Sequence, residues 1–171
     1  MSILEVLTSK VAHGMLYPLL PKARGSSVRR PMYIAEDLWS LFGTSHPDPV
    51  MEGRIGTLRA DLESFVDGTA LYPGYLFLLS PTKEAVWEIR STRLDPSIRV
   101  LGRFADRDIF IATNYAIRNE LGGWESRAWR DAKLKSRTIW TNLFHTYQPV
   151  IATDIHKVAS GAINGKYFKT H

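Results

Sequence analysis

The spacing of apolar residues predicts two long helices. Over residues 52–66, apolar side chains recur at three- and four-residue steps and polar ones fill most other positions, which is typical of an amphipathic helix. We expect Asp67-Gly68 to end this helix, because glycine suits a left-handed cap. After Gly122-Gly123, residues 124–147 show a similar buried stripe, and Pro149 closes the segment.

Four shorter runs between these helices predict strands. They are residues 75–79, 85–90, 98–104 and 109–116. Short turns join neighbouring runs, which favours an antiparallel meander. Because successive side chains of a strand point to opposite faces, Arg99 and Arg103 share one face, and we expect that face to meet solvent or a ligand.

Breaks in the pattern divide the chain into three parts. Residues 1–50 hold two short helical patterns separated by the loop Lys22–Pro31, which has four positive charges and no negative one. We interpret this part as an N-terminal helical extension with a basic, solvated loop. Residues 51–148 are the expected compact core, and residues 149–171 are a C-terminal tail with some helical spacing, whose last few residues we expect to be mobile.

Composition narrows the classes of protein and favours an anionic partner. The chain has 171 residues with 22 Lys and Arg against 17 Asp and Glu, and its pI is about 9.6. This modest surplus of positive charge favours a partner such as nucleic acid. With 44% hydrophobic residues, the chain is not disordered throughout. The absence of cysteine excludes disulfide scaffolds, thiol catalysis and cysteine-based metal sites.

No export signal or membrane span is expected. The longest apolar stretch, residues 70–79, is interrupted by Pro73-Gly74 and is far shorter than the ~20 residues that a bilayer requires. We therefore expect a cytoplasmic protein without a membrane partner.

The sequence favours neither metal nor cofactor chemistry. It has no phosphate loop, dinucleotide fingerprint, zinc-protease motif or nucleophile elbow. The five histidines are scattered, without the spacing of metal ligands. Asp106 and Asp108 are most simply turn formers. We predict no metal and no cofactor.

Arginine is the remaining candidate for chemistry. Arg90, Arg99 and Arg103 come from neighbouring predicted strands, and Arg118 follows the next. On a rigid sheet, guanidinium groups can form a preorganised clamp for phosphate. Alternatively, these arginines form a solvated face paired with nearby acids.

Further basic and aromatic residues extend this candidate surface. Tyr115 and Trp124 can stack on exposed bases. The expected RNA-binding residues are Arg103, Trp124, Arg127, Arg130, Lys133 and Arg137.

The order of motifs resembles that of a known family. An amphipathic helix precedes Val86-Trp87-Glu88-Ile89-Arg90, then Ile98-Arg99-Val100-Leu101, then an apolar strand that ends at Arg118. In this order, residues 54–137 resemble the RelE/HigB-like toxin superfamily, including its phage-derived branch. The resemblance implies an α+β fold in which helices pack on a small twisted antiparallel sheet. Here that fold would have N- and C-terminal helical extensions.

The resemblance also implies a function. Such a protein would bind RNA or the ribosome, and the family's usual activity is metal-independent cleavage of messenger RNA in the ribosomal A site. Arg99 would bind the scissile phosphate, Arg118 would stabilise developing charge, and Arg90 would be the basic residue of its strand. Tyr115 and His145 are candidates for proton transfer without a firm motif position.

A second function remains open. The chain is alternatively a non-enzymatic protein-interaction module or inhibitor, of phage or mobile-element origin, on the same fold. An antitoxin or another protein would then be its partner.

Overall fold

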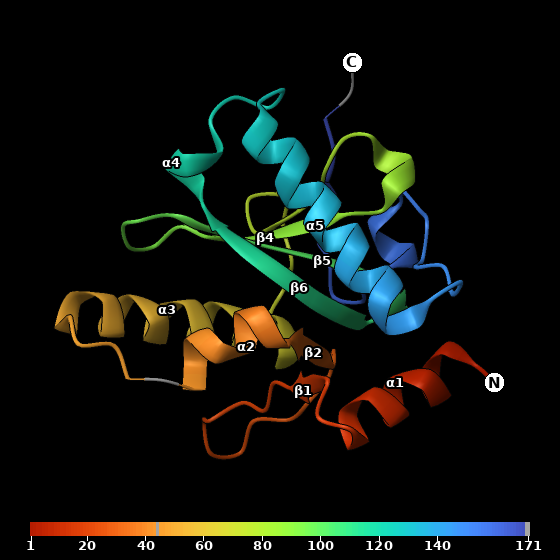
Figure 1. The fold of residues 1–171 in the computed structure, drawn as a ribbon, viewed down its shortest axis with the longest axis horizontal. Coiled ribbons are helices and arrows are strands. Elements are labelled where there is room, and N and C mark those ends of the chain that lie inside the picture. Colours follow the sequence, from red (N-terminus) through yellow and green to blue (C-terminus); the bar gives the residue numbers. More distant parts are fainter. Residues whose placement is uncertain (44, 170–171) are drawn as a thin grey trace.

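The structure is an α+β arrangement built on one open, six-stranded mixed sheet (Figure 1). It is a computed structural model, and it describes residues 1–43 and 45–169. The strand order is β1-β2-β6-β5-β4-β3. The strands are β1 Leu16–Pro18, β2 Met32–Ala35, β3 Leu76–Leu78, β4 Trp87–Ser91, β5 Ile98–Asp106 and β6 Ile109–Ile117. The predicted α+β class and the antiparallel meander of the last four strands are confirmed.

The N-terminal part differs from the helical extension that we expected. It contributes β1 and β2 to the sheet, and β2 runs parallel to β6, so the sheet is mixed rather than wholly antiparallel. Met32 and Ile34 are buried in the main core. Neither strand exceeds four residues, which is too short to give a clear alternating pattern.

Five α-helices surround this sheet in the described residues. They are α1 Ile3–Ala12, α2 Glu36–Gly43, α3 Pro49–Val66, α4 Arg118–Leu121 and α5 Arg127–Phe144. Two short 3-10 helices are η1 Thr82–Glu84 and η2 Ile155–Lys157. The helix predicted over 124–147 begins later, at Arg127, because the Ser126 hydroxyl accepts a hydrogen bond from the Trp129 backbone N–H and caps it.

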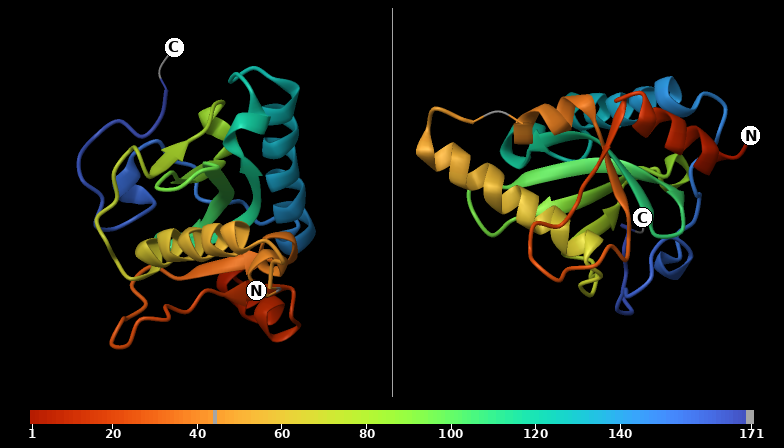
Figure 2. Two further views of the ribbon diagram at one scale, coloured as in Figure 1. Left: turned by 90° about the vertical axis from the view of Figure 1, so that its left-hand side faces the viewer. Right: turned by 90° about the horizontal axis from the view of Figure 1, so that it is seen from below.

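Helices cover both faces of the sheet (Figure 2). On one face, Val100 and Phe104 of β5 pack in the core with α3 and the C-terminal segment. On the other face, Leu101 packs against Trp129 of α5. The face expected to meet solvent therefore lies under α5, and Arg103 is buried there. The strand pattern predicted the shared face correctly, but it held no information about where α5, which begins 24 residues after Arg103, would dock.

The C-terminal segment is part of the core, although it contains only η2 as a helix among its described residues. Tyr167 is buried, and a parallel β-bridge joins Phe168 to Leu78 of β3. The buried Arg30 holds this segment to α3, donating to the carbonyl oxygens of Phe65 at 2.7 Å and Ser160 at 2.6 Å. The mobility expected at the extreme end concerns residues 170–171, which lie outside the described residues.

The helices of residues 1–43 and 45–169 include none that is long and apolar enough to cross a bilayer.

Candidate nucleic-acid interface

Arginines meet around one buried carboxylate on the α5 side of the sheet. Glu88 of β4 is completely buried, and its Oε1 accepts a 2.8 Å hydrogen bond from Arg90 Nε. Arg99 Nε of β5 lies 3.6 Å from Oε2 of the same carboxylate. Strand register explains this meeting: Arg90 is paired with Arg99, and Glu88 lies two residues earlier on the same face. Together with Arg118, these residues are called the Glu88 cluster.

The electrostatics of the Glu88 cluster favour an additional anion. Burial raises the pKa of Glu88, and the charges of Arg90, Arg99 and Arg118 oppose that rise. Burial also lowers the pKa of Arg99, which Glu88 opposes. Within the described residues, Glu88 Oε2 has no hydrogen-bond partner. One carboxylate thus faces three guanidinium groups, and the cluster keeps an excess of positive charge.

An aromatic pocket of 730 Å³ lies beside this cluster. Its wall includes Phe77 of β3, Trp124, Trp129 of α5 and Phe168. The rings of Trp124 and Trp129 are stacked, with centroids 4.9 Å apart and an interplanar angle of 17°. Trp124 remains 40% exposed, so one ring of the stack is accessible. We call this cavity the Trp124 pocket.

Two arginines connect the Trp124 pocket to the Glu88 cluster. The guanidinium of Arg90 lies 4.5 Å from the ring centroid of Phe77. That of Arg118 lies 5.8 Å from the ring centroid of Trp129. The cluster and the pocket are therefore joined by two contacts between arginine and aromatic side chains.

The rim of the Trp124 pocket is basic. Arg130, Lys133 and Lys169 line it, against the single acid Glu125. Lys133 Nζ is held by the Ser80 carbonyl oxygen at 2.7 Å. The first turn of α5 carries no acidic residue, so the positive end of its dipole is not offset there. Aromatic walls with cationic edges suit a ligand that combines a planar base with a phosphate.

The comparisons with known proteins find no matching family model, no matching curated protein and no matching solved structure.

The structure brings together most of the residues that the sequence singled out, but not all of them. Arg90, Arg99 and Arg118 converge, and Trp124, Arg130 and Lys133 line one pocket. Tyr115 lies apart from both groups. It pairs with Val100, whose side chain is in the α3-side core, so Tyr115 projects from the opposite face to Arg99.

Three other predicted RNA-binding residues lie outside the Trp124 pocket. Arg103 is buried, donates to the Glu84 carbonyl oxygen at 2.6 Å and lies over the Trp140 ring. Burial and the nearby charge of Arg137 lower the pKa of Arg103 to about 10. Arg137 pairs with Glu84 at 3.6 Å, and the largely exposed Arg127 pairs with Asp131 at 3.7 Å. Arg103 therefore fixes η1 against the sheet rather than facing a ligand.

Sequence reasoning missed several members of the site. Phe168 and Lys169 come from the tail, which gave no sign of lying beside β3. Phe77 was part of an apolar run and was indistinguishable from a core residue. Glu88 lies between Trp87 and Ile89 in the strand, so the alternation of side chains predicts that it shares a face with Arg90. The sequence did not indicate that Glu88 would be completely buried.

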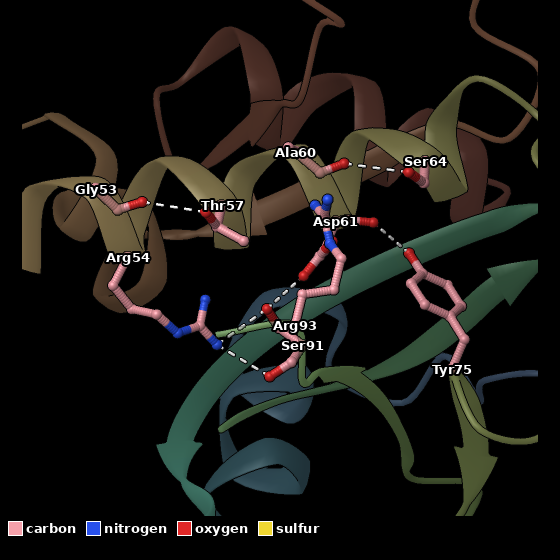
Figure 3. Close-up of polar contacts among 9 residues, drawn as sticks. All are labelled: Gly53, Arg54, Thr57, Ala60, Asp61, Ser64, Tyr75, Ser91 and Arg93. Atoms are coloured by element: carbon pink, nitrogen blue, oxygen red, sulfur yellow. Dashed lines mark hydrogen bonds and ion pairs between the residues drawn. The ribbon is translucent and has the colours of Figure 1, made fainter. Parts of the chain in front are cut away.

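A second polar cluster lies on the α3 side of the sheet (Figure 3). Asp61 of α3 accepts a 2.6 Å hydrogen bond from the Ser91 hydroxyl and a 2.7 Å one from Arg93 Nε. The buried Arg54 donates from Nη2 to the Ser91 carbonyl oxygen at 2.9 Å and to its hydroxyl at 3.1 Å. Tyr75 donates to the Asp61 carbonyl oxygen. This set, called the Asp61 cluster, fastens α3 to the end of β4.

Proposed function

We propose that this protein binds single-stranded RNA, with a base against the Trp124 ring and phosphates on the neighbouring basic side chains. The observation that carries the proposal is the joining of the aromatic Trp124 pocket to the arginine-rich Glu88 cluster through Arg90 and Arg118. Stacking on aromatic rings and contact with cations are the two general means of binding single strands. The choice of RNA over DNA rests on the sequence resemblance to the RelE/HigB-like toxins.

Cleavage of the bound RNA is a second candidate, favoured by the convergence of Arg90, Arg99 and Arg118. Guanidinium groups held around one point can stabilise the charge that develops on a phosphate under attack by a 2′-hydroxyl. The geometry supports binding better than cleavage, because Tyr115 lies on the other face of the sheet and Arg99 is largely covered.

The test compares two exposed aromatic residues on opposite faces of the sheet. Trp124 is 40% exposed and Tyr115 is 37% exposed, which makes Tyr115→Ala a matched control for Trp124→Ala. Fluorescence anisotropy with a labelled single-stranded oligoribonucleotide should show Trp124→Ala weakening binding by about 5- to 150-fold, the range for loss of one base–aromatic stack. Tyr115→Ala should bind as the wild type does.

The same incubations, separated on a denaturing gel, test cleavage. Fragments made by the wild type but not by Arg118→Met would support it. Equal losses of affinity in Trp124→Ala and Tyr115→Ala would contradict the proposed binding site. A wild-type protein that binds no RNA would contradict the function as a whole, and would favour the protein-interaction alternative.

A further inference from the structure

A second pocket, of 430 Å³, lies on the α3 side of the same sheet edge. Tyr72, which is 50% exposed, lines it together with the hydroxyl-bearing residues Ser64, Thr69 and Thr92. Arg93 supplies a guanidinium that is 64% exposed. An accessible ring, several hydroxyls and an arginine are again suited to a nucleotide. We call this cavity the Tyr72 pocket.

Arg90 connects the two pockets. Its guanidinium contacts the ring of Phe77 in the wall of the Trp124 pocket, and Arg90 also lines the Tyr72 pocket. Its backbone N–H donates to the Tyr75 carbonyl oxygen, which places Arg90 just beyond the start of β3. The pockets open on the two faces of the sheet, because Phe77 pairs with Glu88 on the α5 side whereas the Tyr75 ring belongs to the α3-side core.

Charge in the Tyr72 pocket does not oppose a phosphate. The one carboxylate among its lining residues is that of Asp61, and Arg93 pairs with it through both Nε and Nη2. The Ser91 hydroxyl donates to its other oxygen. With both oxygens of Asp61 engaged, the pocket presents no unpaired carboxylate to a phosphate.

We propose that the Tyr72 pocket takes a second base of the same RNA strand. The phosphate between the two bases lies at Arg90, the strand bends around the end of β4, and the bases are splayed onto opposite faces of the sheet. The ligand is therefore at least a dinucleotide of unpaired RNA. This inference rests on the proposed function, because it takes the Trp124 pocket as the first base site.

The test compares uridine 5′-monophosphate with the dinucleotide UpU, monitored by quenching of tryptophan fluorescence. Wild-type protein should bind UpU at least about fivefold more tightly than the mononucleotide, since a second stacked base is added. Tyr72→Ala should remove that gain and leave mononucleotide binding unchanged. Tyr72→Phe, which keeps the ring, should retain the gain. Because fluorescence in Trp124→Ala loses one reporter, its affinities for both ligands are measured by competition against a labelled oligonucleotide, and both should fall.

The outcomes separate the two proposals. Equal affinity for UpU and the mononucleotide, with both still weakened by Trp124→Ala, would overturn the second base site and leave the proposed function standing. If Trp124→Ala changed neither affinity, both the proposed function and the second base site would be contradicted. A UpU gain that survives in Tyr72→Ala, with a melting temperature equal to that of the wild type, would also overturn the Tyr72 pocket.

Discussion

The Glu88 and Asp61 clusters each place arginines around a carboxylate at the same end of the sheet, but they differ in how completely their charges are satisfied. Both oxygens of Asp61 accept hydrogen bonds, and Arg54 donates to Ser91 and Pro96, although its Nη1 has no partner within the described residues. Glu88 is shared among three arginines and leaves Oε2 without a hydrogen bond in that same part of the chain.

The difference separates a structural role from a binding role. A polar network whose members satisfy one another fixes elements together and gains little from a further ion. A cluster with surplus cations beside an accessible aromatic pocket gains from an added phosphate. Arginine-rich composition alone does not distinguish the two, because both clusters contain arginine held close to an acid.

The largest contrast between stability and RNA affinity is expected when one arginine of each cluster is replaced by methionine. Arg54 is 1% exposed, and Arg54→Met removes its hydrogen bonds to Ser91 and Pro96. We expect a loss of about 2–4 kcal/mol in the free energy of unfolding, because hydrogen bonds from a buried charge are lost while methionine still fills the space of the stem. RNA affinity at a temperature where the variant is folded should be unchanged.

Arg118→Met is the counterpart in the Glu88 cluster. Arg118 donates to the Gly122 carbonyl oxygen and no ion pair within 4.0 Å holds it among the described residues, so its removal should cost less than about 1 kcal/mol of stability. RNA affinity should fall about three- to tenfold, with a shallower dependence on salt, since a phosphate contact is lost. Denaturant unfolding and anisotropy titrations measure both effects. The reverse pattern, with Arg54→Met weakening RNA binding and Arg118→Met only unfolding the protein, would contradict the comparison.

A smaller change in RNA affinity is expected when the carboxylate of Glu88 is replaced. Glu88→Gln keeps the shape of the side chain but removes the internal counter-ion of Arg90 and Arg99. Free of this competition, the arginines should bind phosphate about two- to fivefold more tightly, a gain comparable to one exposed ion pair. Asp37→Asn removes the counter-ion of Lys135, a residue that lines neither the Trp124 pocket nor the Tyr72 pocket, and as the control it should leave RNA affinity unchanged. Weaker binding by Glu88→Gln would show that the carboxylate orients the arginines rather than competing for them.

The dependence on pH should be the smallest effect, and its sign follows from the raised pKa of Glu88. Because burial raises this pKa above its ordinary value of 4.5, the contribution of Glu88 to folding stability is fully present below that value and is lost as the pH rises through the folded pKa. A bound phosphate raises the pKa further, so binding takes up a proton. RNA affinity should therefore fall as the pH rises through the raised pKa of Glu88. In Glu88→Gln, which has no carboxyl group to titrate, this fall in affinity should be absent. Identical pH profiles for the two proteins would contradict this coupling.

The sequence predicted the long helix and the four-stranded meander well, because the apolar spacing that identifies each element lies within its own residues. The helix over 52–66 and the four strands of the meander have apolar periodicities that their own residues carry, and short turns restrict how they pair. The pairing of β2 with β6 and of Phe168 with Leu78 joins segments more than 70 residues apart, so no window of sequence contained it.

The candidate site was predictable in its residue types and only partly in its geometry. Strand alternation placed Arg90, Arg99 and Glu88 on one face, and this placement is what the structure has. Whether that face is open or covered depends on where α5 docks, which is why Arg103 was expected to be accessible and is buried. For Tyr115, an irregular register in β5–β6 between Leu101 and Gly102 contributes to its position on the other face.

The central claim is that RNA contacts the Trp124 pocket, and photo-crosslinking tests it most directly. Single-stranded RNA containing 4-thiouridine is crosslinked to the wild-type protein, and the modified residues are located by mass spectrometry. The account predicts crosslinks at Trp124 and Phe77, which line this pocket. Crosslinks confined to the basic loop Lys22–Pro31, which has four positive charges but does not line the pocket, would contradict it.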